Sequence, residues 1–191
     1  GHAGICGGQQ LDLEWEGRSL DRGELMAIHL RKTSALIRAA CLMGVAAAGG
    51  TAVSDAEEIY KTCDVIMQIL PTHAIIRDSV EKAIRFGKPG RIIVDLSSTA
   101  PDIIQEMYQD AKKAGMFLLD SPISGGNPMA IAGTLAIMTG GDKEAFEQVK
   151  PLLECMGHPV YTGGAGSGSV TKLVNNIVAG AYMVVIAEAY A

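Results

Sequence analysis

This sequence of 191 residues contains few aromatic residues, few charged residues and few cysteines, and each shortage excludes a kind of structure or site. Aromatic residues make up 5% and charged residues 19% of the chain, whereas hydrophobic residues make up 48%. A disordered chain needs low hydrophobicity and high charge, so this composition excludes one. With few rings available, the core must be built from aliphatic side chains and the nine methionines. The length predicts one domain or slightly more than one.

The four cysteines are widely spaced, at Cys6, Cys41, Cys63 and Cys155. They form no C-x-x-C pair and no cluster with histidine, so no metal site is predicted. Scattered cysteines are typical of a reducing compartment, and the N-terminal residues lack the basic and apolar regions of a secretory signal. We therefore expect a cytoplasmic protein.

Positive charge is also limited. Lys and Arg together number 16 against 21 Asp and Glu, the formal net charge is −5, and no basic run occurs. Nucleic acid is therefore not an expected partner. The longest apolar run, Ile177 to Ala187, is shorter than a bilayer span, which needs about 20 residues. No membrane contact is expected, and the run is predicted to form a buried helix.

Short apolar runs bounded by turn residues predict the strands. They do not alternate between apolar and polar residues, which is typical of strands that are buried on both faces of a parallel sheet. The runs occupy residues 64–71, 91–97, 116–121, 134–140 and, more weakly, 159–163.

Helical patterns with capping signals separate these strands. Ser54 and Glu57 form a capping box before a short helix, and Thr99 with Pro101 can cap a helix that ends at Lys113. Further helices are predicted over residues 24–40, 78–85 and 142–155. The alternation of strands and helices predicts an α/β doubly wound domain with ligands at the carboxyl ends of its strands. Residues 1–50 are atypical, because no strand followed by a G-x-G-x-x-G turn opens the chain.

Motifs that follow two of the strands could hold a ligand. Residues 120–126, DSPISGG, carry small residues whose bare backbone N–H groups can hold carboxylate or phosphate oxygens, although an ordinary glycine turn explains this motif alone equally well. Hydroxyl residues at 97–99 follow another strand, and Thr99 is also explained as a plain helix cap.

A third motif joins a glycine-rich loop at residues 163–168 to a predicted helix. The N-terminus of such a helix favours anions. Lys172 and Asn176 are four residues apart, so both side chains lie on one helix face and can contact one oxygen atom. A surface lysine beside a helix cap is the ordinary explanation. A lysine that enters a buried helix, however, needs a partner or a function.

The sequence resembles the β-hydroxyacid dehydrogenase family, which includes 3-hydroxyisobutyrate dehydrogenase and tartronate semialdehyde reductase. The segments that carry the resemblance are CDVIMQILP, IIVDLSSTAP, FLLDSPISGGNPMAIAGTLAIMTGG and GGAGSGSVTKLVNNIVAG, which occur in the family's order. The resemblance implies a Rossmann-like, mainly parallel sheet that binds NAD or NADP in residues 1–163. Residues 164–191 would then begin a long interdomain helix of an all-helical domain.

The resemblance also implies the function and the site. It implies reversible hydride transfer between a small 3-hydroxy acid and the nicotinamide cofactor, with Lys172 as general acid and base. The substrate would be bound by Ser124, Gly125, Gly126 and Asn176. The cofactor would be contacted by Leu70, Pro71 and Ser98.

Departures from the family pattern leave alternatives open. The glycine fingerprint is missing, and Met129 stands where relatives usually have glycine, which would crowd the substrate loop. A truncated or degenerate homologue without activity, acting as a binding or dimerisation module, is therefore the second hypothesis. A decarboxylating 6-phosphogluconate dehydrogenase ranks lower, because Asn175 occupies the place of its usual histidine. A stripe that would contact the helical domain, at Ile177, Tyr182, Val185 and Ile186, predicts a homo-oligomer through the C-terminal helix.

Overall fold

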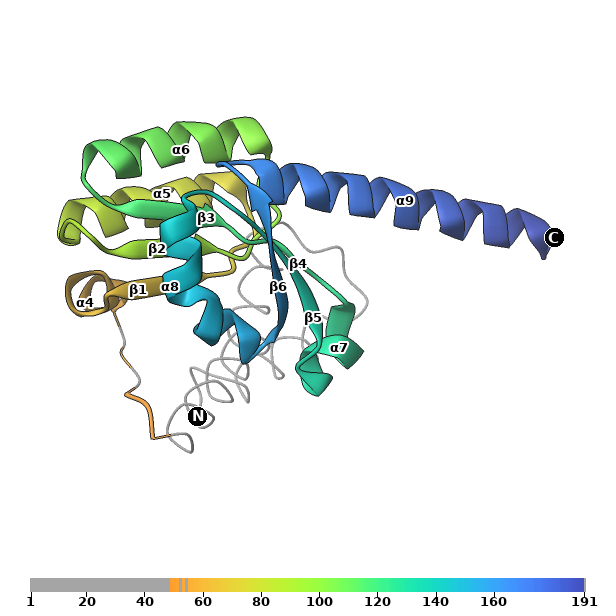
Figure 1. The fold of residues 1–191 in the computed structure, drawn as a ribbon, viewed down its shortest axis with the longest axis horizontal. Coiled ribbons are helices and arrows are strands. Elements are labelled where there is room, and N and C mark those ends of the chain that lie inside the picture. Colours follow the sequence, from red (N-terminus) through yellow and green to blue (C-terminus); the bar gives the residue numbers. More distant parts are fainter. Residues whose placement is uncertain (1–48, 52, 54, 191) are drawn as a thin grey trace, which may run out of the picture. The chain divides into compact units, whose positions relative to one another are not determined.

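The computed structural model describes residues 49–51, 53 and 55–190, and Figure 1 shows its ribbon. The chain divides into two units between Ser54 and Asp55, and the architecture given below is that of the second. The helix predicted over residues 24–40 and the atypical first βα unit lie outside the described residues.

A sheet of six strands forms the centre of this unit. Strands β1, β2 and β3 are parallel neighbours, whereas β5 runs antiparallel to β3 and β4 and parallel to β6. The prediction of a mainly parallel sheet is confirmed. The antiparallel part and the short β4 were not predicted, because β4 belongs to a motif that the sequence presents as a loop. The strands are β1 (Val65–Gln68), β2 (Ile92–Asp95), β3 (Phe117–Asp120), β4 (Ile123–Ser124), β5 (Leu135–Gly140) and β6 (Gly157–Gly163).

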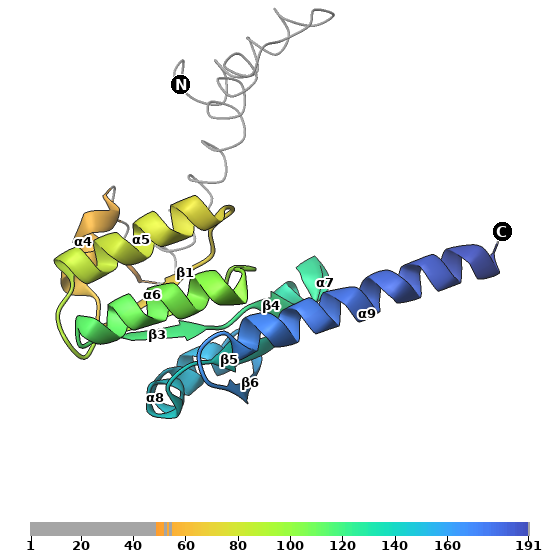
Figure 2. The same ribbon diagram turned by 90° about the horizontal axis from the view of Figure 1, so that it is seen from above.

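Helices cover both faces of the sheet, as the doubly wound prediction requires. Helices α4, α5 and α6 pack on one face and α8 packs on the other (Figure 2). The helices are α4 (Ala56–Thr62), α5 (His73–Phe86), α6 (Pro101–Lys113), α7 (Gly126–Ala132), α8 (Lys143–Glu154) and α9 (Ser167–Ala189).

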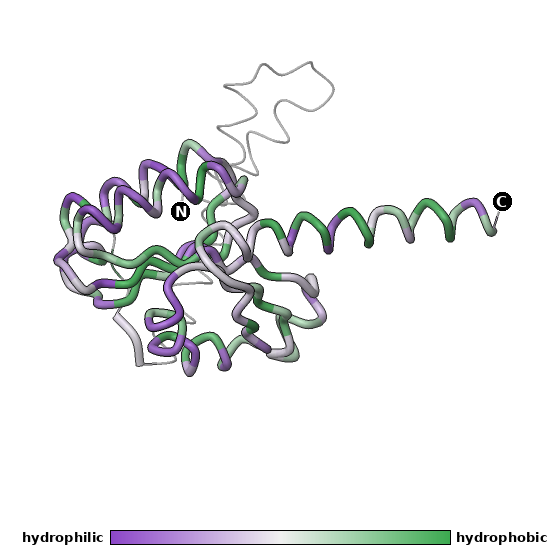
Figure 3. Tube along the Cα trace, turned by 45° about the horizontal axis from the view of Figure 1, so that its top comes forward, coloured by the Kyte–Doolittle hydropathy of each residue, from purple (hydrophilic) through white to green (hydrophobic). Residues whose placement is uncertain are grey.

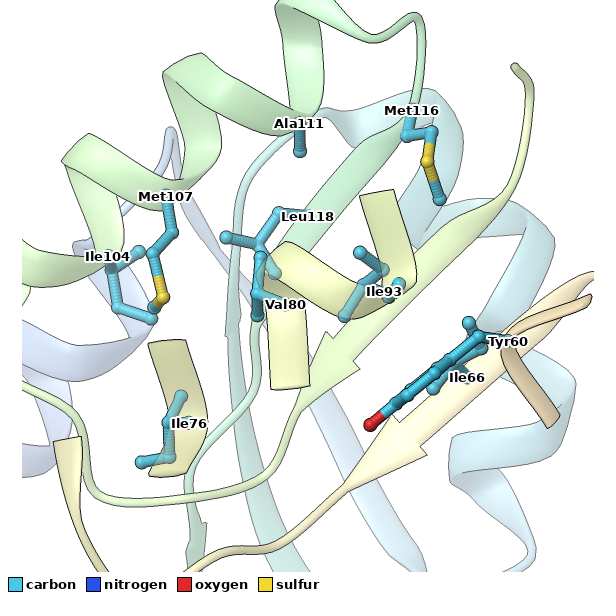
Figure 4. Packing of buried hydrophobic residues seen from close by; sticks show 11 residues of the cluster. Tyr60, Ile66, Ile76, Val80, Ile93, Ile104, Met107, Ala111, Met116 and Leu118 are labelled. Carbon is cyan, nitrogen blue, oxygen red and sulfur yellow. The ribbon is translucent and has the colours of Figure 1, made fainter. Parts of the chain in front are cut away.

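Two aliphatic clusters form the core, one on each face of the sheet. The first joins α4, α5 and α6 to β1, β2 and β3, with Val80, Ile93 and Leu118 lying between the other labelled side chains (Figure 4). The second packs α8 against the opposite face. Strand β2 contributes alternate side chains to each cluster, and every residue of β2 is buried. This confirms the inference, drawn from solidly apolar runs, that the strands are covered on both faces.

Several helix starts differ from the sequence prediction. The side chain that caps α4 is Asp55, which accepts a hydrogen bond from the Glu57 N–H, and not Ser54. Helix α5 begins at His73 rather than at residue 78, with Thr72 as its cap. Thr99 does not cap α6, because its hydroxyl donates to a buried carboxylate and Ala100 is the N-cap residue. The Thr99 hydroxyl therefore holds the turn after β2 and does not cap the helix that follows.

Helix α9 contradicts the prediction of a buried helix. Only Gly168 and Ser169 of α9 are buried, while Ile177 is 70% and Tyr182 65% exposed. Figure 3 shows hydrophobic residues along the whole helix beyond the sheet. By length and composition alone, α9 could also cross a membrane, so the absence of membrane contact stays a prediction. A helix that is apolar on all sides normally lies in a core or a bilayer, so sequence alone does not reveal this exposure.

Candidate functional site

A cavity of about 160 Å³ lies beside the carboxyl ends of β2 and β3. This volume is below the roughly 300–1,000 Å³ of a drug-sized ligand pocket, so the cavity can hold a small molecule or one end of a larger one. Ligands bind at this edge of open α/β sheets. The residues that line the cavity are His73, Ser98, Thr99, Ala100, Pro122, Ser169, Lys172, Leu173 and Asn176.

Helix α9 supplies one wall of the cavity. The contributing residues, Ser169, Lys172, Leu173 and Asn176, recur every three or four positions and therefore share one helix face. The structure thus brings Lys172 and Asn176 together, as their spacing predicts. Lys172 is half-buried, and this burial lowers the pKa of its ammonium group because removal from water disfavours the charged form. From the sequence, Lys172 is expected to be buried because α9 would be a buried helix. Lys172 is instead half-buried because it forms part of the cavity wall.

The loop predicted to bind the substrate carboxylate is tied to α9. The Asn175 amide donates a hydrogen bond of 3.2 Å to the Ser124 hydroxyl. Gly125 and Gly126 both have positive φ, at 137° and 62°, a region that favours glycine. Met129 lies directly over Gly125, because a Cβ placed on Gly125 would stand 2.7 Å from the Met129 Cβ. Ser124, Gly125 and Gly126 do not line the cavity that contains Lys172 and Asn176. The structure therefore does not place all the predicted substrate-binding residues in one pocket.

The residues predicted to contact the cofactor divide between two places. Ser98 is exposed and lines the cavity of Lys172. Leu70 lines a separate cavity between α4 and α5, and its backbone N–H donates a 2.9 Å hydrogen bond to the Ser97 hydroxyl. Pro71 is exposed and lines neither of these two cavities. The Leu70–Ser97 bond nevertheless joins the segments that follow β1 and β2.

A buried carboxylate holds the segment after β2 in place. The Asp95 side chain, which is fully buried, accepts hydrogen bonds from the Ser97 N–H at 3.2 Å and from the Thr99 hydroxyl at 2.6 Å. Two bonds to residues on either side of Ser98 fix the backbone there. Ser98 therefore lines the cavity from a constrained turn.

A second buried carboxylate, Asp120, holds the start of α9. Its oxygens accept hydrogen bonds from the Gly166 N–H at 2.9 Å and from the Ser169 N–H at 2.7 Å. Burial raises the pKa of Asp120, while the bonds from Ser169 and Gly166 favour the ionised form. The side chain of Asp120 thus caps a helix that begins far along the chain.

Sequence reasoning missed several residues of this site. His73 faces the cavity from the first turn of α5, and Thr99 lines the cavity besides bonding to Asp95. Asp120 begins the DSPISGG motif at residues 120–126, but no role was predicted for its side chain. The sequence carries one signal for Asp120, because an acidic residue at the end of an apolar strand is expected to be buried and then needs hydrogen-bond donors.

The fold and site define a Rossmann-like domain with ligand-facing residues at the carboxyl ends of its strands. The chain belongs to the family of NAD-binding domains of 6-phosphogluconate dehydrogenase, whose family model matches residues 26–164. The resemblance to β-hydroxyacid dehydrogenases that the sequence motifs indicate is confirmed by the relatives described next.

The chain is 33% identical to an NAD-dependent L-serine dehydrogenase from Pseudomonas aeruginosa, with 88% of this chain and 60% of that protein covered. It is 34% identical to a 2-(hydroxymethyl)glutarate dehydrogenase from Eubacterium barkeri, covering 87% of this chain and 58% of the relative. The structure of a 3-hydroxyisobutyrate dehydrogenase from Mycobacterium tuberculosis with L-serine matches with a TM-score of 0.71 and 35% identity, over 75% of this chain and 50% of that one. The chain therefore spans only 50–60% of the length of these relatives.

Proposed function

We propose that this chain is part of an NAD(P)-dependent oxidoreductase that transfers a hydride between a small 3-hydroxy acid and the nicotinamide cofactor. The observation that carries the proposal is a single cavity lined by Lys172, Asn176 and Ser98, two of them from α9 and one from the turn after β2. A half-buried lysine beside an amide and a hydroxyl is suited to a proton transfer at one substrate oxygen. The named activities of the relatives, all dehydrogenases of small hydroxy acids, support the same reaction class.

The cavity fits the reactive end of a nicotinamide cofactor. Its lining combines apolar surfaces of Ala100, Pro122 and Leu173 with the Ser98 hydroxyl, and a ring that needs few polar contacts suits such a lining. The nicotinamide ring, when bound, accepts or donates the hydride. Ser98 would contact this ring, and Leu70 and Pro71 would line the cofactor further along the strand ends.

The chain's own residues would transfer the proton and bind the substrate. During oxidation, the neutral Lys172 amine accepts the proton of the substrate hydroxyl, and during reduction its ammonium returns a proton to the carbonyl oxygen. The ammonium also stabilises negative charge that develops on that oxygen. Asn176 would orient the same oxygen from one helical turn beyond. Ser124, Gly125 and Gly126 lie outside this cavity but are joined to α9 by the bond between Asn175 and Ser124. From there they would hold the substrate carboxylate through hydroxyl and backbone N–H groups.

Saturating NADH or NADPH is expected to raise the melting temperature of the protein by about 5–10 °C. At 100 times Kd, a ligand that binds only the folded state adds about 2.7 kcal/mol, and a chain of this size gains about 2–4 °C per kcal/mol. Differential scanning fluorimetry measures the shift, and quenching of the sole tryptophan, Trp15, gives an independent readout. AMP at the same concentration is the control. If neither dinucleotide produces a shift, the proposed function is contradicted.

A truncated or degenerate homologue without activity is the second candidate. The missing glycine fingerprint favours it, because that turn holds the pyrophosphate in dinucleotide-binding domains. Such a protein would act as a binding or dimerisation module and would bind neither dinucleotide in the thermal-shift measurement. The coding sequence on both sides of these 191 residues is the most direct discriminator, since it reveals whether a complete first βα unit and a helical domain are encoded.

We also propose that the protein forms a homo-oligomer through α9, in a cytoplasmic setting. Tyr182 and Val185 are 65% and 64% exposed, and they belong to an apolar surface that a partner would cover. Replacing both residues with glutamate is expected to shift sedimentation of the protein from a dimer or larger species to a monomer. Ile131→Glu on α7 removes an apolar side chain that is even more exposed, at 81%, and serves as the control. A wild-type protein that sediments as a monomer at high concentration would refute the proposal.

A further inference from the structure

Helix α9 carries Lys172 and contacts the rest of the fold mainly through its N-terminal part. Its buried residues are Gly168 and Ser169, both in the first turn, and most residues beyond Asn175 are exposed. The position of Lys172 is therefore set by whatever holds this first turn. A catalytic group must be fixed to within about 0.5 Å by its supporting residues.

The side chain of Asp120 holds the turn from β3, in addition to a 2.9 Å hydrogen bond between the hydroxyls of Thr162 and Ser167. It bonds to the N–H groups of Gly166, which is the N-cap residue of α9, and of Ser169, at 2.9 Å and 2.7 Å. The helix has no hydrogen bond from an N-cap side chain of its own. Asp120 is 1% exposed, and its negative charge faces the positive end of the helix dipole.

The surrounding glycines fit this arrangement closely. A Cβ on Gly140 would stand 2.6 Å from an Asp120 carboxylate oxygen, and a Cβ on Gly168 would stand 2.5 Å from the Asp120 carbonyl oxygen. Any side chain at residue 140 or 168 would therefore collide with Asp120, so glycine at both positions lets α9 approach β3 closely. Lys172 follows Ser169 by three residues and lies on the same helix face.

We propose that Asp120 is the positioning residue that places Lys172 in the cavity, an inference that rests on the function proposed for Lys172. The bonds to Gly166 and Ser169 fix both the rotation of α9 about its axis and its distance from β3. Without them the lysine would move relative to the turn that carries Ser98. Asp120 acts through α9 and does not contact the substrate.

Asp95 provides a matched control. It is the register partner of Asp120 on the neighbouring strand and is also fully buried. Its hydrogen bonds go to Gln68, Ser97 and Thr99, so it holds the turn of Ser98 and not α9. The two aspartates therefore support opposite walls of one cavity.

The test compares Asp120→Asn with Asp95→Asn in the protein as it is expressed from its complete gene. Asp120→Asn removes the charge at nearly constant volume, and Asp120→Ser is the second variant in case the first does not fold. The variant at residue 120 is expected to lower kcat on the order of 10²-fold, as a misplaced catalytic group does, with KM for the cofactor unchanged. Asp95→Asn is expected to raise that KM and to change kcat less.

Lysine NMR on selectively labelled protein supplies a readout that does not depend on turnover. In the residue-120 variants the pKa of Lys172 is expected to rise toward the ordinary lysine value, because the side chain becomes more hydrated, whereas Asp95→Asn leaves this pKa unchanged. Wild-type protein without any hydroxy-acid turnover would contradict the proposed function, and the NMR comparison would still test Asp120. Folded residue-120 variants with the wild-type pKa of Lys172, or with wild-type kcat in an active protein, would overturn the inference.

Discussion

Replacing Lys172 with alanine is expected to lower kcat for oxidation of a 3-hydroxy acid by about 10²–10⁴-fold, the usual contribution of a general acid or base. Binding of the cofactor is expected to remain within about twofold of wild type, because Lys172 would act on the substrate oxygen and Ser98 on the cofactor. Steady-state kinetics and titration of NADH or NADPH measure the two quantities separately. The difference between them identifies Lys172 as a residue of the chemical step.

The pH dependence of the same reaction gives a second signature. Oxidation needs the neutral amine, so kcat should rise with pH and level off above the pKa of Lys172. Burial lowers that pKa, so the plateau should begin below the ordinary lysine value. This pH dependence should be absent in Lys172→Ala. Lys113→Ala, at an exposed surface lysine, controls for the loss of one positive charge. Retained turnover in Lys172→Ala would refute the mechanism.

The strands could be predicted from the sequence because each is a short apolar run between turn residues. Val65–Gln68, Ile92–Asp95 and Phe117–Asp120 all fall within the predicted runs. The antiparallel pairing of β3 with β5 could not be predicted in this way. An apolar run that is buried on both faces does not show whether the neighbouring strand runs parallel or antiparallel to it. The exposure of α9 could not be predicted either, because an all-apolar helix has the same sequence pattern whether or not another domain covers it.

The site could be predicted only where spacing along one element determines it. Lys172 and Asn176 lie four residues apart on a helix, so their shared face follows from helical geometry alone. Contacts between distant segments are different. Asn175, not Asn176, bonds to Ser124, and Asp120 reaches Gly166 and Ser169 across the fold. Such pairs depend on how β3 and β4 pack against α9 and its first turn, which no local pattern encodes.

The close packing of α9 on the sheet can be tested by adding one methyl group. Gly168→Ala would place a Cβ 2.3 Å from the Met138 carbonyl oxygen and 2.5 Å from the Asp120 carbonyl oxygen. Both are backbone atoms of adjoining strands, so neither can move aside as a flexible side chain would. The substitution is expected to lower the free energy of unfolding by about 2–4 kcal/mol, measured by urea denaturation, and to reduce kcat by displacing Lys172.

Gly180→Ala, in the same helix, separates packing from helix propensity. A Cβ on Gly180 would have no atom within 4 Å, so alanine there should stabilise the helix by up to about 1 kcal/mol and leave kcat unchanged. Both substitutions make the same chemical change on α9, and only the one at residue 168 meets the backbone of β3 and β5. Equal effects at the two positions would mean that the first turn of α9 does not pack against these strands, and the placement of Lys172 in the cavity would then lose its structural basis.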